Sequence, residues 1–231
     1  RAERVIDDVA SIQQELRGEF ATLEGRCRIA ASPFLAIHLL GPAWEYLRSA
    51  HPQLSCEISA MSTGRVIHGV LDGTLDFGLC FSPLRQPGLR QVDLHHGQLR
   101  IAVAKSHPLL TQKKPLDAIQ ALSGIPAVIH KSVSGVDLCD MHPMYDHFGI
   151  KLDIEMVFEG DDLAVQRVAN SQSWSLLPDV VIEAHPQLVC SLAAPSDWDA
   201  PYTISAIFHQ HREQNPVIQS LLAALKGRIS T

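Results

Sequence analysis

The sequence predicts an α/β protein made of two doubly wound lobes that are joined by two crossing strands. Three observations support this prediction: short apolar runs alternate with helical patterns, the alternation occurs twice, and 231 residues are enough for two small lobes. Parallel doubly wound sheets show this alternation, because a helix must carry the chain from the end of one strand to the start of the next.

A helix is expected ahead of the two lobes. Residues 1–22 are mostly polar, and their apolar positions recur every three or four residues. This spacing gives a narrow apolar seam along one face of a helix, which Gly25 would end. Because such a helix cannot bury its seam alone, we expect it to pack on another subunit or to be a truncated connector. Residues 1–24 are therefore assigned to a linker and dimerisation helix.

The first lobe is expected to follow as a β-α-β-α-β unit. Pro33 occupies the favoured first position of a helix, and Gly73 fits a left-handed C-cap. The expected elements are a strand at 27–31, a helix from 33 to before 51, a strand at 54–60, a helix at 66–71 and a strand at 75–81.

A crossing strand at 99–104 is expected to lead into the second lobe, where the alternation resumes. Lobe I is thus assigned residues 25–103 and 204–231, and lobe II residues 104–203. The remaining expected elements are strands at 125–130, 152–158, 174–177 and 202–208, and helices at 135–148, 162–170, 180–184 and 215–226.

Charge and hydropathy exclude two classes of partner. The formal net charge is −6, and Lys and Arg are scattered rather than clustered. Duplex DNA binding normally needs a basic surface, so this segment is not expected to bind DNA alone. No apolar run approaches the length of a membrane span, and no signal peptide opens the chain.

The cysteines do not suggest a disulfide framework or a zinc site. They are odd in number and widely spaced, and no CxxC occurs. This usage favours a reducing cytosol. Cys56 and Cys80 fall in expected strands and should be inert, so a thiol-sensing hypothesis would rest on Cys139 and Cys190.

Small polar residues stand where four of the expected strands pass into helices. In an open α/β sheet these junctions collect at the carboxyl ends of strands, where ligands bind. The first N–H groups of each helix lack intrahelical partners and attract anions. A site for a small carboxylate is therefore expected, with its donors at Ser32, at Ser62 and Thr63, at Ser132 and Ser134, and at Gly160.

Several stretches carry a family resemblance by their order and spacing, from about Gly25 to Lys226. These are Arg28–Pro33, Leu71–Leu79, Pro87–Leu89, Ser106–Leu109, Leu176–Pro178 and Asn215–Val217. On these stretches the chain resembles the effector-binding region of LysR-type transcriptional regulators, which has the type 2 periplasmic-binding-protein fold. The chain departs from the family at Ser171 and Ser173, where two glycines are usual. Trp174 also replaces a small aliphatic residue, so we expect its ring to fill part of the cavity or to stack on a ligand.

The resemblance implies a ligand-sensing, dimerising domain that catalyses no reaction and uses no cofactor or metal. It implies a small effector bound between the lobes, a homodimer, with a tetramer as an option for the full-length protein, and a cytoplasmic location. DNA would be contacted only through a winged helix-turn-helix that this chain lacks, and contact with RNA polymerase is also compatible with the family. The effector-binding residues would be Ser32, Phe34, Ser62, Thr63, Phe81, Ser132, Ser134, Gly160 and Trp174.

Three alternatives compete with this interpretation. A periplasmic solute-binding protein of the same fold is disfavoured by the five cysteines and the first helix. Thiol-based redox sensing by the same regulator domain is retained as a further alternative. An enzyme such as a late porphyrin-pathway deaminase lacks a nucleophile motif. The histidine pairs His142 and His147, and His209 and His211, lack the carboxylate or thiolate companions of a metal site.

Overall fold

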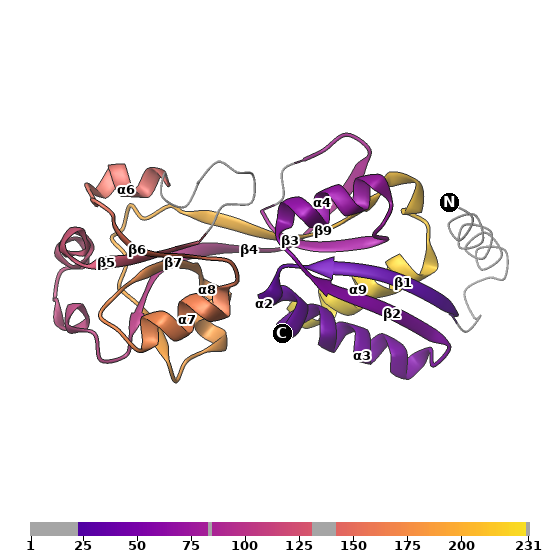
Figure 1. Ribbon diagram of the computed structural model, residues 1–231, viewed down its shortest axis with the longest axis horizontal. Helices are drawn as coiled ribbons and strands as arrows, with labels where there is room; N and C mark the ends of the chain where they lie inside the picture. Colours follow the sequence, from indigo (N-terminus) through magenta and orange to yellow (C-terminus); the bar gives the residue numbers. More distant parts are fainter. Residues whose placement is uncertain (1–22, 83–84, 131–141, 230–231) are drawn as a thin grey trace. The chain divides into compact units, whose positions relative to one another are not determined.

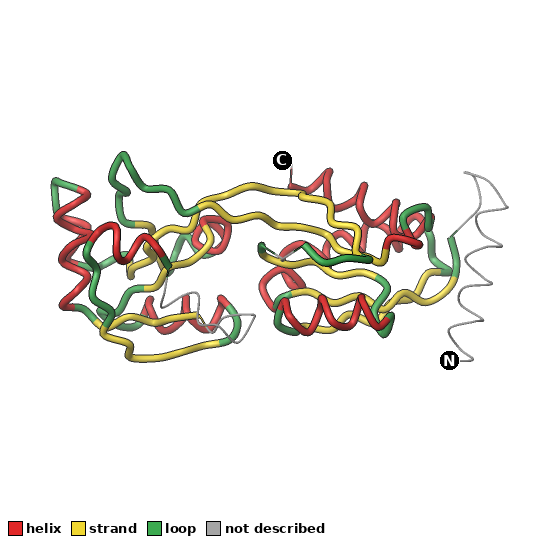
Figure 2. Tube along the Cα trace, turned by 90° about the horizontal axis from the view of Figure 1, so that it is seen from above, coloured by secondary structure: helices red, strands yellow, loops and turns green. Residues whose placement is uncertain are grey.

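The computed structural model describes residues 23–82, 85–130 and 142–229, which form two compact units. Unit 1 comprises the described residues up to His95 and from Thr203 onward, and unit 2 comprises His96–Tyr202. Strands β4 (Leu89–Ala104) and β9 (Pro201–His209) both run from one unit into the other (Figure 1 and Figure 2). The predicted class, two α/β lobes joined by two crossing strands, is confirmed. Residues 1–22 of the expected linker helix lie outside the described residues.

Unit 1 is built on parallel strands that continue into an antiparallel crossing strand. Its strand order is β2 (Leu54–Ala60), β1 (Gly25–Ala31), β3 (Phe77–Phe81) and β9. β1 pairs in parallel with β2 and β3, and β3 pairs antiparallel with β9. The end of β1 carries no exposed side chain, because helices cover both faces of this sheet.

Helix α4 (Thr63–Asp72) covers one face of these strands, and α3 (Gly41–Ala50) and α9 (Pro216–Ile229) cover the other (Figure 1). Gly73 ends α4 in the left-handed region with φ 71°, as its sequence position predicts. Ahead of α3, a short helix α2 (Pro33–Leu35) passes into a π-helical turn at Ala36–Leu40. Pro42 accounts for this wider turn, because its ring clashes with the carbonyl four residues earlier and it has no N–H.

The apolar face of α9 is buried against α3 inside unit 1. Ile218, Leu221 and Leu225 are each at most 1% exposed. The fold uses this face for the core of unit 1, so it is not available to a partner subunit.

Unit 2 combines two small sheets. β7 (Ser175–Pro178) and β8 (Val189–Ser191) pair antiparallel with β4, while β5 (Pro126–His130) and β6 (Asp153–Phe158) form a parallel pair. A bridge from Ala127 to Trp174 connects the two pairings. The helices are α5 (Pro115–Gln120), α6 (Pro143–Phe148), α7 (Asp161–Ala169) and α8 (Asp179–Ala184).

Several elements differ from the sequence expectation. β4 is 16 residues long and begins at Leu89 rather than near residue 99, and α5 and β8 were not predicted. The early part of β4 is half-buried, so it lacks the continuous apolar run that marks a fully buried strand. The expected helix at 135–148 is described only from Pro143, where His142 caps it by accepting a hydrogen bond from the Met144 N–H at 3.3 Å.

Candidate functional site

Ser32 stands at the end of β1, directly before the first helix of unit 1. The residue is 9% exposed, and its Oγ is buried without a hydrogen-bond partner. The Ser32 carbonyl accepts the Ala36 N–H at 2.9 Å, but the hydroxyl does not cap the helix. Serine often caps a helix at this position with its hydroxyl, and Ser32 does not. An unsatisfied buried hydroxyl costs about 1–3 kcal/mol, so Ser32 is a natural place for a ligand or water to bind.

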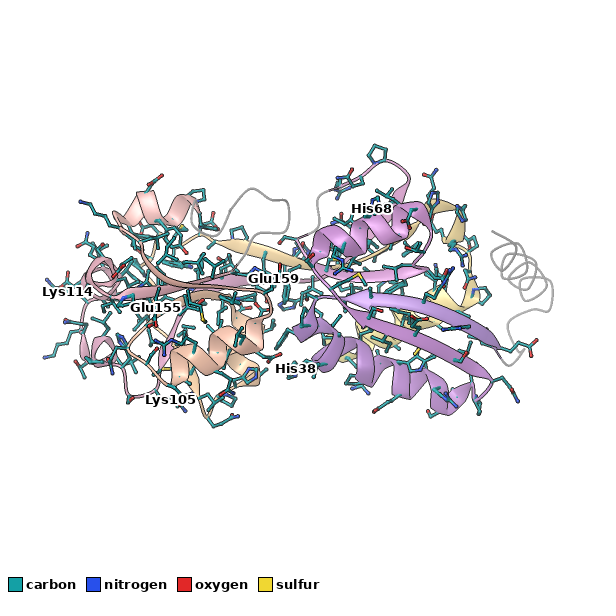
Figure 3. The ribbon with its side chains drawn as sticks, in the orientation of Figure 1. His38, His68, Lys105, Lys114, Glu155 and Glu159 are labelled. Atoms are coloured by element: carbon teal, nitrogen blue, oxygen red, sulfur yellow. The ribbon has the colours of Figure 1, made fainter. Side chains whose placement is uncertain are left out.

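Aromatic side chains follow Ser32 within the same unit. Phe34 is 2% exposed, stacks on His38 with ring centroids 4.4 Å apart, and lies 6.3 Å from the half-buried Phe81. Figure 3 labels His38 on this first helical segment. Phe34 is therefore a packed core side chain, and the solvent-exposed part of this aromatic cluster comes from Phe81 and His38.

The second junction of unit 1 places its two polar side chains differently. Ser62 is half-buried and precedes α4 without a side-chain cap. Thr63 is 4% exposed, and its hydroxyl is hydrogen-bonded to the thiol of Cys80. The Thr63 hydroxyl is therefore used inside unit 1, whereas the Ser62 hydroxyl lies nearer to solvent.

In unit 2, Gly160 begins the junction between β6 and α7. Its φ of +98° is a conformation that favours glycine, and the chain then enters α7 at Asp161. Asp161 is 4% exposed, and burial raises its pKa, while His130 opposes this shift and Asp162 adds to it. Asp161 was not among the predicted site residues, although an acidic residue in the first turn of a helix can be recognised from the sequence. Ser132 and Ser134 lie outside the described residues.

Trp174 requires a correction, since its ring belongs to the core of unit 2. The side chain is fully buried, its Nε1–H donates to the Ile125 carbonyl at 3.0 Å, and Tyr145 meets it edge-on at 6.0 Å. No part of the ring is exposed to a ligand. The indole fills the space between β5, β7 and α6 that a smaller residue would leave empty.

The serines that replace the usual glycines anchor the turn between α7 and β7. The Ser171 hydroxyl accepts the Ser173 N–H at 3.1 Å and donates to the Arg167 carbonyl at 2.9 Å. The Ser173 hydroxyl donates to the carboxylate of Glu155, labelled in Figure 3, which also pairs with Arg167. These contacts tie the turn to β6 and α7.

The described cysteines are held in the protonated thiol form. Cys27 and Cys80 are buried, and Cys56 and Cys190 are half-buried. Burial raises the pKa of all four thiols, that of Cys80 to about 12. Because the thiolate is the reactive form, these residues are expected to react slowly. Cys139 lies outside the described residues.

The two histidine pairs of the sequence analysis make contacts of other kinds. His147 bonds Asp197 at 2.8 Å, while His142 caps α6. The rings of His209 and His211 lie 4.1 Å apart, and the His209 ring accepts the His211 N–H at 3.5 Å. Capping uses one ring nitrogen of His142 and of His209.

Comparison with known proteins assigns the family. Residues 21–230 match the family described as LysR substrate binding domain. The chain belongs to this family. The transcriptional regulator BenM of Acinetobacter baylyi is 28% identical over 108 residues, which are 47% of this chain and 34% of BenM. The matched region thus spans about a third of the length of that curated relative.

Solved structures agree with the fold of a LysR substrate-binding domain. The effector-binding domain of QuiR in complex with shikimate has a TM-score of 0.71 at 15% identity and covers 90% of this chain and 98% of its own. An OxyR mutant of Corynebacterium glutamicum has a TM-score of 0.74 at 19% identity and covers 99% of this chain and 72% of its own. Within the described residues, no helix is long and apolar enough to cross a membrane.

Proposed function

We propose that this chain is the effector-sensing and dimerising part of a cytoplasmic LysR-type transcriptional regulator, and that it catalyses no reaction. Its family membership supports this function, as does the likeness to a QuiR domain that binds shikimate. The small molecule would favour one arrangement of the two lobes and thereby shift a population of conformations. With a net charge of −6, the chain would influence DNA through another domain of the regulator.

The observation that carries this proposal is the buried, unpartnered hydroxyl of Ser32. Because its oxygen has no hydrogen bond in the free protein, an effector carboxylate could accept from it without displacing an internal contact. The N–H groups that open the following helix supply further positive potential. Ser62, Phe81 and Gly160 remain further predicted contacts, whereas Thr63 would contribute only its backbone.

A ligand screen by thermal shift, followed by calorimetry with Ser32→Ala, tests the proposal. We expect Ser32→Ala to lose about a factor of ten in affinity, as for one hydrogen bond to a charged group. Without ligand, the Ser32→Ala variant should be as stable as wild type or more stable, since the Ser32 hydroxyl makes no hydrogen bond that could be lost. Ser49→Ala is the matched control, because its exposed hydroxyl donates only to the Tyr46 carbonyl at 2.7 Å. Equal affinity of wild type and Ser32→Ala would show that the hydroxyl does not contact the effector.

Exposed apolar side chains support a homodimer. In unit 1, Ile37 is 62% and Tyr46 64% exposed on the first helical segment, and in unit 2 Val157 is 55% and Leu163 54% exposed. Large exposed apolar side chains mark association surfaces when they gather on neighbouring elements. A two-fold dimer would pack the unit 1 surface of one subunit on the unit 2 surface of its partner, twice.

The oligomer can be tested by sedimentation of wild type, Tyr46→Glu and Leu71→Glu. Leu71 is also exposed, at 38%, but lies on α4. We expect Tyr46→Glu to sediment as a monomer at micromolar concentration and Leu71→Glu as a dimer. A wild-type chain that is monomeric under these conditions would remove the dimer from the proposal. It would also favour the solute-binding alternative.

Redox sensing is a second candidate because the OxyR structure shares this fold. It would require a reactive thiol, and burial raises the pKa of the four described ones. Treatment with peroxide followed by mass analysis tests it. Formation of a disulfide that changes DNA binding by the full-length regulator would favour redox sensing over effector binding.

A further inference from the structure

Asp179, the first residue of α8, binds both crossing strands on the unit 2 side. Its Oδ2 accepts the Gln98 N–H of β4 at 2.9 Å, and its Oδ1 accepts the Tyr202 O–H of β9 at 2.6 Å. Tyr202 is 5% exposed, so the second bond is largely removed from water. Burial and the neighbouring Asp179 carboxylate raise the pKa of the Tyr202 phenol, which therefore remains a donor.

The Tyr202 ring also rests on β4 at Gly97. A Cβ at this position would lie 2.6 Å from the ring, so only glycine lets the Tyr202 ring lie this close to β4. One residue further on, the Gln98 side-chain carbonyl accepts the Ala200 N–H at 2.9 Å. Within unit 2, β4 from Gly97 onward and the chain up to Tyr202 are therefore fixed to each other and to α8.

On the unit 1 side, a second carboxylate joins the two crossing strands directly. Asp93 of β4 accepts the hydroxyl of Ser205 of β9 at 2.7 Å, and Ser205 is fully buried. Thr203, at the start of unit 1 on β9, donates its N–H to the Ser82 hydroxyl at 3.1 Å and accepts the Ser82 N–H at 2.8 Å. β9 is thus held to unit 1 from Thr203 onward, one peptide bond after Tyr202.

We propose that Asp179 and Asp93 are positioning residues that mark the two ends of the pivot between the units. Changes in the inter-unit angle are then confined to the residues between Asp93 and Gly97 on β4 and to the Tyr202–Thr203 link on β9. Rotation about bonds further along either strand would break a hydrogen bond to one of these carboxylates. The inference rests on the proposed function, since an effector can act only through an angle that the chain is free to change.

The test measures the distribution of distances between one label on each unit, without effector. His68 on α4 and Lys114 at the start of α5 are exposed and labelled in Figure 3. Both can be replaced by a spin-labelled non-natural residue, which leaves the cysteines untouched, and excess unlabelled chain keeps the distance within one subunit. Two variants are compared with wild type. Tyr202→Phe removes the hydrogen bond from β9 to Asp179 but keeps the ring on Gly97, and Asp179→Asn removes one accepting oxygen.

We expect both variants to broaden the distance distribution relative to wild type. In Asp179→Asn the Gln98 amide should also exchange with solvent about tenfold faster or more, as the bond to a charged acceptor is weakened. Asp197→Asn is the matched control, because it removes an exposed Asp–His contact in unit 2 that involves neither crossing strand. Its distribution should equal that of wild type.

Wild-type widths in both folded variants would overturn the inference, as would equal broadening in Asp197→Asn. If Asp179→Asn does not fold, Tyr202→Phe decides alone, since it removes a single oxygen. No effector enters this experiment, so its failure leaves the Ser32 binding test intact. Unchanged affinity of Ser32→Ala likewise leaves the pivot standing.

Discussion

Asp76 should contribute more to stability than the exposed ion pair between Arg26 of β1 and Glu57 of β2. Its carboxylate lies before β3 and accepts three hydrogen bonds from Arg28 of β1, from the backbone N–H at 2.8 Å, Nη2 at 3.0 Å and Nε at 3.3 Å. Arg212, in the turn after β9, approaches it to 3.3 Å. The side chain of Asp76 is 6% exposed, that of Arg212 15% and that of Arg28 28%.

The change Asp76→Ala leaves two partly buried guanidinium groups without this carboxylate. Breaking a buried pair by removing one partner costs about 3–5 kcal/mol. We expect the lower end, about 3 kcal/mol, because Arg28 can be rehydrated at its exposed side. For a chain of this size, that corresponds to a fall in Tm of roughly 6–12 °C.

Glu57→Ala is the matched control on the neighbouring strand. Arg26 of β1 and Glu57 of β2 are only 2.6 Å apart, but their side chains are 66% and 55% exposed. Water and salt screen such a pair, so its loss should cost at most about 1 kcal/mol. Burial, rather than the distance between the charges, therefore decides the difference between the two variants.

Urea unfolding followed by 19F signals of fluorotryptophan can measure both losses in unit 1. Trp44 lies in unit 1, while Trp174 and Trp198 lie in unit 2, so the Trp44 signal reports unit 1 alone. Raising the salt to about 1 M should erase the Glu57 contribution and leave most of that of Asp76. Equal losses in the two variants would refute the reasoning from burial.

Three further predictions follow from single residues of the fold. Burial lowers the pKa of His142 below 6.5, so the unfolded chain binds more protons than the folded chain as the pH falls below that value. The urea midpoint should therefore decrease as the pH is lowered from about 7 to about 5, and it should decrease less in His142→Gln. Cys80, with a pKa raised to about 12, should react with iodoacetamide only after unfolding, and modification of the native chain at Cys80 would contradict its burial. Trp174→Phe should cost about 2 kcal/mol in urea unfolding, because the Ile125 carbonyl loses its donor and a cavity forms; a loss below about 0.5 kcal/mol would show that the core closes over the gap.

The order of elements could be predicted from the sequence because several strands, among them β3, β5, β7 and β9, are buried over most of their length. Ile29–Ala31 and Leu176–Pro178 stand out as apolar or small residues in a polar surrounding, and glycines such as Gly73 end helices by their backbone freedom. The first half of β4 was missed because its side chains are half exposed, so its pairing partners, rather than its hydropathy, make it a strand.

The candidate site was predictable only in part. Ser32 was recognised as a strand-to-helix junction, but whether its hydroxyl caps the helix depends on a side-chain rotamer that no pattern encodes. Trp174 was assigned to the cavity because an unusual ring attracts a functional interpretation; the tertiary fold places it in the core instead. Asp161 is buried by contacts from other elements, which a single sequence does not display.

The division of the chain has a consequence for synthesis on the ribosome. Unit 1 is discontinuous, since the chain leaves it at His95 and returns at Thr203, and its strand β3 pairs with β9 across more than a hundred residues, as in Gly78 with Ile207. Helix α9, which completes the core against α3, follows unit 2 in the chain and is therefore made after it. Unit 2 is continuous, and its ends lie on neighbouring strands. We therefore expect unit 2 to become protease-resistant on the ribosome first, while the residues translated before it wait for β9 and α9.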